Sequence, residues 1–181
     1  MDVIGLKGER VRLVPPDRER HLENGLRWMN DPEVTGTIEL NFGITRRQEE
    51  KFFEHIELDR ETQMHWAIVT EDDRHIGFIG LHLINWRHRS TSGGLLIGER
   101  ADWGRGYATD AVRTRTRFVF EQMGLHRLEG HTFNPAMRRV YEKCGYHHEG
   151  TARQKMWRDG RWHDVELYAI LAADHFATRP N

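Results

Sequence analysis

The alternation of apolar and polar residues divides the chain into short strands. Five segments of alternating or continuous apolar residues predict strands at 10–13, 64–68, 76–84, 95–97 and 128–133. Two further strands close the chain, and the Asp-Gly pair between them is typical of a hairpin turn. The last strand carries four apolar residues on one face: Val165, Leu167, Ala169 and Leu171.

Two helices are predicted in the first third of the chain. Asp17 is placed to cap a helix that runs to Met29, and the Asn-Asp-Pro sequence after it ends the helix. Thr45 and Gln48 form a capping-box pattern that starts the second helix. That helix should turn three apolar residues inward: Phe52, Phe53 and Ile56.

Two more helices follow. One starts near Ala108 and ends at Gly124. Its apolar stripe consists of Ala108, Ala111, Val112, Phe118, Val119 and Met123. Its basic residues Arg113, Arg115 and Arg117 are expected on the solvent face. The other helix starts at Asn134-Pro135 and ends at Gly145, and it turns inward the residues Met137, Val140, Tyr141 and Cys144.

The order of these elements, β-α-α-β-β-β-α-β-α-β-β, predicts an α/β (α+β) fold. We expect a mixed, mostly antiparallel central sheet of six to seven strands flanked by helices. The length of 181 residues and the absence of a linker or repeat favour a single domain over residues 1–181.

Composition excludes several function classes. The formal net charge is −1, whereas proteins that bind nucleic acid through its phosphates are usually basic, so no nucleic-acid partner is expected. No segment approaches the roughly 20 apolar residues that span a bilayer, and no signal peptide is evident. Cys144 is the only cysteine. These observations favour a cytoplasmic protein without a membrane partner.

The segment Trp103-Gly104-Arg105-Gly106-Tyr107-Ala108-Thr109 lies between a strand and a helix. Its two glycines allow a ligand to approach the backbone, and the N-terminus of the helix adds partial positive charge. The segment therefore predicts a phosphate site, unless it is only a tight turn. A P-loop is excluded because no Gly-Lys-Ser/Thr follows.

A dinucleotide site is the main alternative. Gly104-x-Gly106-x-x-Thr109 is close to the dinucleotide fingerprint, and Glu129 lies where a ribose-binding acid would be. However, six residues separate Ile97 from Gly104, and only about 50 residues follow Glu129, too few to complete a doubly wound sheet. A pyrophosphate on a long flexible carrier, such as coenzyme A, fits better.

The sequence resembles the GNAT superfamily of N-acetyltransferases. Residues 98–111 are similar to its acetyl-CoA motif, and 125–128, Asn134 and 141–146 to the motif that follows. The segment 28–34 and the hairpin with Asp159-Gly160 and Asp164 resemble the RimJ/RimL branch. The chain departs from the superfamily pattern at Ala101, where Gln or Arg is frequent, and at Ala136-Met137, where Arg-Ala is frequent.

The resemblance implies acetyl-CoA as co-substrate and no metal. The residues implied to bind it are Leu96, Ile97, Gly104, Arg105, Gly106, Tyr107, Ala108, Thr109 and Asn134. The strand at 95–97 would splay from its neighbour and offer backbone N–H groups to the acetyl carbonyl. Asn134 would contact the pantetheine arm, although it also fits a plain helix cap.

The same resemblance implies the catalytic residues. Tyr141, seven residues after Asn134, occupies the place of the family's acid, although a core tyrosine is the alternative. Glu129, five residues before Asn134, lies where some relatives carry a base, because the attacking amine must lose a proton. A solvent-exposed strand carboxylate is equally compatible with Glu129. His131 and Glu99 are the other candidates for the base.

No sequence pattern identifies the acyl acceptor. The RimJ/RimL resemblance implies a protein N-terminal amine, with a polyamine, amino sugar or aminoglycoside as alternatives. A coenzyme-binding regulatory module without catalysis and a dinucleotide-dependent enzyme remain as other classes. A homodimer is compatible with this family. No HExxH or other zinc pattern occurs among the 12 histidines, so no metal site is expected.

Overall fold

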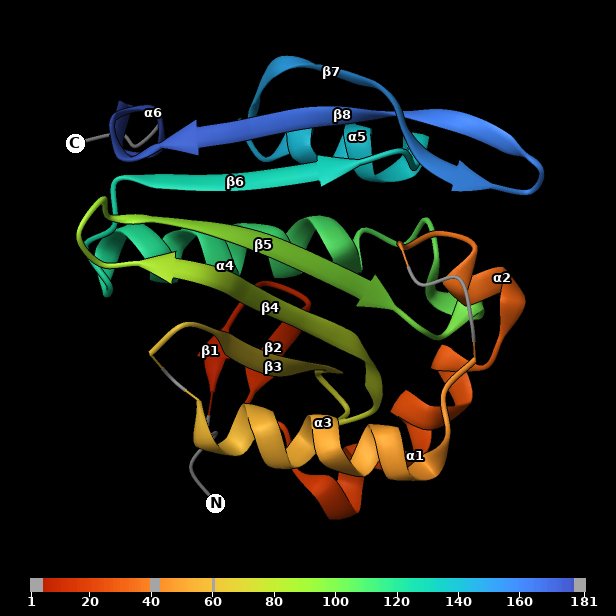
Figure 1. The fold of residues 1–181 in the computed structure, drawn as a ribbon. Helices are drawn as coiled ribbons and strands as arrows, with labels where there is room; N and C mark the ends of the chain where they lie inside the picture. The colour runs from red at the N-terminus through yellow and green to blue at the C-terminus, as the bar shows by residue number, and fades with distance from the viewer. Residues whose placement is uncertain (1–4, 40–42, 60, 178–181) are drawn as a thin grey trace.

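A single sheet of eight strands organises the fold (Figure 1). The structure is a computed structural model that describes residues 5–39, 43–59 and 61–177. The strands are β1 (Leu6–Lys7), β2 (Val11–Val14), β3 (Met64–Thr70), β4 (His75–Asn85), β5 (Ser90–Ile97), β6 (Arg127–Thr132), β7 (His147–Arg158) and β8 (Arg161–Leu171). The helices are α1 (Arg18–Met29), α2 (Pro32–Thr35), α3 (Arg46–Leu58), α4 (Tyr107–Glu121), α5 (Pro135–Lys143) and α6 (Ala172–Ala177), with a 3-10 turn at Arg100–Asp102. No described helix has the length and apolar character to cross a membrane.

The strand order is β1-β2-β3-β4-β5-β6-β8-β7. Every described pair of neighbours is antiparallel except β5 and β6. The predicted α/β class and mostly antiparallel sheet are therefore confirmed. The strand count of six to seven is one short, because β1 has only two residues and leaves no periodic signal in the sequence.

The parallel pair β5–β6 is joined over only part of its length. Residues Ser90–Ser92 pair with Arg127–Glu129, whereas β5 continues to Ile97 and β6 to Thr132 without pairing each other. Figure 1 shows the two strands diverging from this point. The sheet therefore opens in its middle, as the family resemblance implied, and leaves backbone groups of both strands available to a ligand.

Local sequence signals start the helices where expected. The Asp17 carboxylate accepts a hydrogen bond from the backbone N–H of Arg20 at 2.9 Å, and Thr45 and Gln48 form a complete capping box. The segment after α1, predicted as a loop up to Gly43, contains the short helix α2; its residues 40–42 lie outside the described part of the chain.

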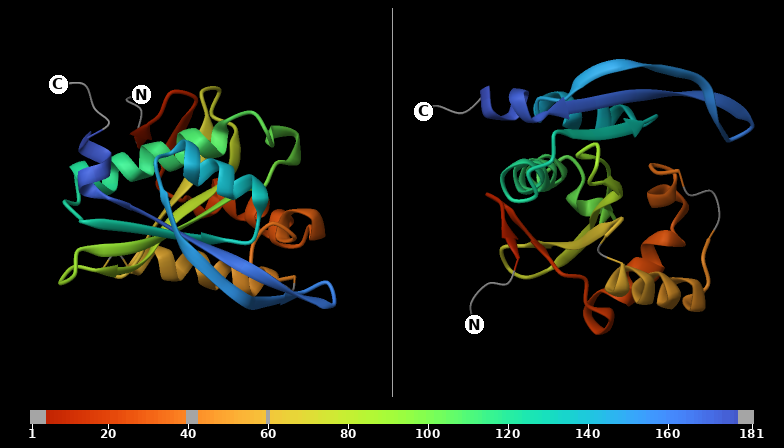
Figure 2. Two further views of the ribbon diagram at one scale, coloured as in Figure 1. Left: turned by 90° about the horizontal axis from the view of Figure 1, so that it is seen from above. Right: turned by 60° about the vertical axis from the view of Figure 1, so that its left-hand side comes forward.

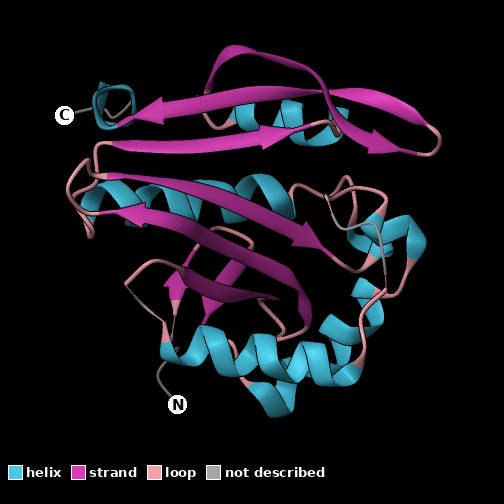
Figure 3. Ribbon diagram, viewed as in Figure 1, coloured by secondary structure: helices cyan, strands magenta, loops and turns pink. Residues whose placement is uncertain are grey.

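The two faces of the sheet are covered by different helices. α4 and α5 lie on one face, and α1 and α3 on the other (Figures 1 and 2; Figure 3 distinguishes helices from strands). The main core lies under α4, where Ala111, Val112 and Val119 pack against the strands. The predicted stripe of α4 is confirmed at these positions.

Two predictions about which side chains are buried are wrong. Arg115, expected in solvent, is completely buried and reaches the sheet. Phe52, expected inward, is exposed, because Phe53 occupies the buried side of α3. On the predicted apolar face of β8, Val165 and Ala169 are buried and Leu167 is exposed, whereas Tyr168 and Ile170 of the other face join the main core. Period-two alternation identifies two faces but not which one the helices will cover.

Candidate active site

The loop before α4 has the backbone geometry that the sequence predicted. Gly104 and Gly106 adopt φ of 76° and 86°, a region that residues with a Cβ avoid. Gly106 is also the N-cap of α4 and has no side chain to satisfy the first N–H groups of the helix. A Cβ at Gly104 would meet no atom within 4 Å, so the loop faces open space rather than packed protein. An anionic group can therefore approach these N–H groups directly.

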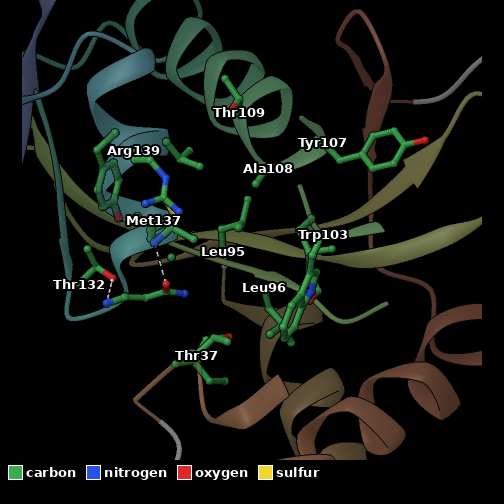
Figure 4. Close-up of a pocket in the computed structure, with 18 of the residues that line it drawn as sticks. Thr37, Leu95, Leu96, Trp103, Tyr107, Ala108, Thr109, Thr132, Met137 and Arg139 are labelled. Carbon is green, nitrogen blue, oxygen red and sulfur yellow. Dashed lines mark hydrogen bonds between the residues drawn. The ribbon is translucent and has the colours of Figure 1, made fainter. Parts of the chain in front are cut away.

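A cavity of about 610 Å³ extends from this loop into the opening between β5 and β6 (Figure 4). Eight of the nine residues predicted to bind the coenzyme line it: Leu96, Ile97, Gly104, Gly106, Tyr107, Ala108, Thr109 and Asn134. Arg105 is the exception. Its carbonyl oxygen accepts a hydrogen bond from Arg10 Nη1 at 2.9 Å, and its guanidinium lies 3.8 Å from Asp102.

Asn134 has the capping role that the sequence offered as one reading. Its Oδ1 accepts a hydrogen bond from the Ala136 N–H at 2.9 Å, and its own N–H donates to Thr132 Oγ1 at 3.0 Å (Figure 4). Because Asn134 also lines the cavity, the cap leaves part of its side chain in reach of a ligand.

Two cations of α5 also line the cavity, and the sequence analysis missed both. Arg139 and Lys143 are one turn apart and exposed, and neither makes an ion pair with a described residue. Their i, i+4 spacing on the helix that starts at Asn134-Pro135 was the available signal. Their charges can attract an anionic group in the cavity. Ala101, where the superfamily pattern has Gln or Arg, does not line the cavity. Arg100, the residue before it, is occupied by ion pairs with Asp31 and Glu33.

The side chain of Tyr141, on α5, lines the cavity. Its ring stacks on Tyr168 with the centroids 5.3 Å apart, and its side chain is almost completely buried. The hydroxyl lies against Gly130 of β6, where a Cβ would come within 2.3 Å of it. Burial raises the pKa of Tyr141 above its ordinary value, so the phenol remains protonated and can donate.

The structure separates the three candidate bases. Glu129 is exposed on β6, accepts a hydrogen bond from Arg127 Nε at 2.6 Å and does not line the cavity. Glu99 accepts from Trp28 Nε1 at 3.1 Å and pairs with Arg27, also outside the cavity. His131 does line it.

His131 is paired with a carboxylate. Its Nε2 lies 3.3 Å from Glu39 Oε1, and Glu39 lines the same cavity. A carboxylate at this distance orients the imidazole. Of the three predicted bases, His131 is the one that the structure brings to the site.

A second histidine, His82 of β4, was missed by the sequence analysis. It stands opposite Ser92 of β5, and its Nε2 lies 3.3 Å from where a Cβ of Gly94 would be. His82 and His131 both line the cavity, on either side of β5. Burial lowers the pKa of His82, and the charges of Arg115 and His131 lower it further. No local sequence signal marks it, because β4 and β6 become neighbours of β5 only in the folded sheet.

Comparison with known proteins identifies the family. Residues 10–147 match the model of the acetyltransferase (GNAT) domain. The chain belongs to the GNAT acetyltransferase family. It is 35% identical over 121 residues to a probable N-acetyltransferase, YjcK, of Bacillus subtilis, covering 65% of this chain and 66% of that protein, slightly under two thirds of its length. It is 29% identical over 131 residues to the spermidine N(1)-acetyltransferase of Vibrio cholerae, covering 70% of this chain and 73% of that protein.

A solved structure of the spermidine N-acetyltransferase from Vibrio cholerae, in complex with CoA and spermine, has the same fold. The TM-score is 0.85 at 21% sequence identity, over 92% of this chain and 98% of that one. This likeness confirms the GNAT-like architecture. The narrower RimJ/RimL assignment is not specifically supported by the family model or by these relatives.

Proposed function

We propose that the protein is an acetyl-CoA-dependent N-acetyltransferase whose acceptor is a small primary amine of the polyamine class. The observation that carries the proposal is the cavity between β5 and β6. It joins a glycine loop at a helix N-terminus to a carboxylate-imidazole pair, Glu39 and His131. The glycine loop suits an anionic coenzyme, and the Glu39–His131 pair suits a cationic amine.

The residues at the coenzyme end fit acetyl-CoA. The free N–H groups at Gly106 and the start of α4, together with Arg139 and Lys143, supply charge for a pyrophosphate. β5 supplies unpaired backbone groups beyond Ser92 for an extended pantetheine chain. Bound there, acetyl-CoA supplies an acetyl group on a thiol that can leave.

His131 is our choice for the base. An amine that arrives as an ammonium must lose a proton before it can attack. Glu39 lies beside the His131 imidazole and can orient it, whereas burial lowers the pKa of His82 and disfavours its protonated form. Glu129 is the less favoured alternative, since its carboxylate is engaged with Arg127 away from the cavity.

Tyr141 is our choice for the acid. A thiol has an ordinary pKa of about 8.5, so the departing sulfur leaves more readily when a donor protonates it. The Tyr141 phenol lines the cavity and is held in place by Tyr168. Its raised pKa keeps the proton available at neutral pH.

The acceptor class rests on two supports. The Vibrio cholerae relative is named as a spermidine acetyltransferase. In addition, Glu39 lines the cavity and offers a carboxylate to a cationic acceptor. The alternative expected from the sequence, a protein N-terminal amine, has less support, so it becomes a competing outcome of the experiment.

The test is release of free thiol from acetyl-CoA with a panel of acceptors. Spermidine and spermine should react faster than amino sugars, aminoglycosides or N-terminal peptides. Glu39→Gln should raise the KM for the polyamine while leaving the KM for acetyl-CoA unchanged. Glu57→Gln, an exposed carboxylate on α3, is the matched control. Preference for a peptide amine would reject the polyamine proposal, and coenzyme binding without turnover on any amine would favour a regulatory module. Competition by NAD with coenzyme A would indicate a dinucleotide site instead.

A further inference from the structure

Arg115 of α4 is a buried cation directly behind the cavity. Its side chain has no exposed surface, and its Nη1 donates to the carbonyl oxygens of Gly80 at 3.1 Å and Gly94 at 3.0 Å. The close approach depends on a glycine, because a Cβ at Gly93 would lie 2.5 Å from the guanidinium carbon. The charge therefore lies against β5 at the point where β5 and β6 separate.

This charge is not neutralised within the described part of the chain. Arg115 makes no ion pair there, its Nε and Nη2 are buried without a geometrically well-placed hydrogen-bond partner, and the side chain with which it interacts at Tyr146 is a neutral phenol. A guanidinium cannot lose its proton in a protein, so it remains charged. Burial of an unpaired charge is unfavourable, and an apolar side chain of similar volume is often as stable or more stable. The unpaired buried charge therefore favours a role for Arg115 beyond fold stability.

The arginine is connected to the cavity through one peptide unit. In a trans peptide, the carbonyl of Gly94 and the N–H of Leu95 point in opposite directions. A hydrogen bond that fixes the Gly94 carbonyl therefore also fixes the direction of the Leu95 N–H. Leu95 lines the cavity and is labelled in Figure 4. A cation bound at the carbonyl also polarises the peptide and makes its N–H a stronger donor.

The field of Arg115 also reaches the two sides of the site. It favours the anionic form of Tyr141 and disfavours the cationic form of His82. Both side chains line the cavity, so the charge acts on the space between them. Negative charge that develops on the thioester oxygen or on the departing sulfur would be stabilised there, and a preorganised charge in a dry site is effective because nothing must reorient.

We propose that Arg115 is a positioning residue for acetyl transfer: it fixes and polarises the Gly94–Leu95 peptide so that the Leu95 N–H stabilises the negative charge formed on the acetyl oxygen. Arg115 itself touches neither the coenzyme nor the amine. The inference rests on the proposed acetyltransferase function.

The test compares three variants by steady-state kinetics and thermal unfolding. Arg115→Met removes the charge and keeps an unbranched side chain, and Arg115→Lys restores a charge. Arg117→Met removes an exposed arginine from the same helix and is the control. Loss of a direct oxyanion donor costs about 10²–10³-fold in kcat, so we expect an indirect contribution of roughly tenfold or more for Arg115→Met. Both KM values and the melting temperature should change little, Arg115→Lys should recover most of kcat, and Arg117→Met should behave as the parent.

Three results would overturn the inference. One is a folded Arg115→Met protein whose kcat equals that of the parent. Another is a loss of kcat that Arg115→Lys does not recover. The third is unfolding of both Arg115→Met and a second neutral variant, Arg115→Leu, while Arg115→Lys folds, which would show a structural role. Failure of the parent protein to acetylate any amine is a different result, since it rejects the proposed function before Arg115 is tested.

Discussion

Glu49 provides a quantitative test of the packing between α1 and α3. Its side chain is 3% exposed, and its Oε1 lies against Gly25 of α1, where a Cβ would come within 2.3 Å. Burial raises the pKa of the Glu49 carboxyl from 4.5 to about 7. Glu49→Gln keeps the shape of the side chain and removes its ionisation. The variant should therefore change how the stability of the fold depends on pH.

The sign follows from the proton balance. Between about pH 4.5 and 7 the folded state holds a proton on Glu49 that the unfolded state has lost, so the carboxyl destabilises the fold as pH rises. One pKa unit corresponds to about 1.4 kcal/mol, and the shift from 4.5 to about 7 therefore corresponds to about 3 kcal/mol. Relative to the unfolding free energy below about pH 4.5, the folded protein has therefore lost this amount of stability once the pH exceeds about 7.

The assay is urea unfolding followed by tryptophan fluorescence, at several values from about pH 5 to about pH 9. The difference in unfolding free energy between Glu49→Gln and the parent should shift by about 3 kcal/mol in favour of the variant across this range. Buried histidines such as His75, whose pKa burial lowers to about 3, change both proteins equally and cancel. Glu57→Gln on the exposed side of α3 is the control. Parallel pH curves for Glu49→Gln and the parent would refute the reasoning.

Three further predictions concern the site. Tyr141→Phe keeps the stack on Tyr168 and removes the proton donor, so turnover should fall by about 10²-fold or more while acetyl-CoA binding, measured by calorimetry, stays near normal; parent-like turnover would leave Tyr141 a packing residue. Gly106→Ala and Gly160→Ala carry similar backbone strain, at φ of 86° and 72°, but only the first should weaken coenzyme binding; equal affinities would argue against the loop as the phosphate site. His131→Gln should lower turnover by about 10²–10⁴-fold and Glu129→Gln should not, as measured by thiol release, and the reverse order would return the base to Glu129.

The local elements and the coenzyme loop could be read from the sequence alone. The helix starts at Asp17, Thr45 and Asn134 depend on residues within three positions of each other, and the structure reproduces them. The positive φ angles of Gly104 and Gly106 are likewise a local property that the residue type indicates. These local predictions agree with the structure because their physical cause lies within one turn of the chain.

Which titratable side chains line the cavity was decided by the tertiary structure. Whether Glu129 or His131 faces the cavity depends on where β6 separates from β5, and His82 joins them only through the pairing of β4 with β5. Arg115 appears in the sequence as one of three alternating arginines, and its neighbours Arg113 and Arg117 are exposed as expected. Arg115 is buried because Gly93 of β5 leaves room for its guanidinium, which donates to carbonyls of β4 and β5. Contacts of that kind join residues 20 or more positions apart, so no local pattern contains them.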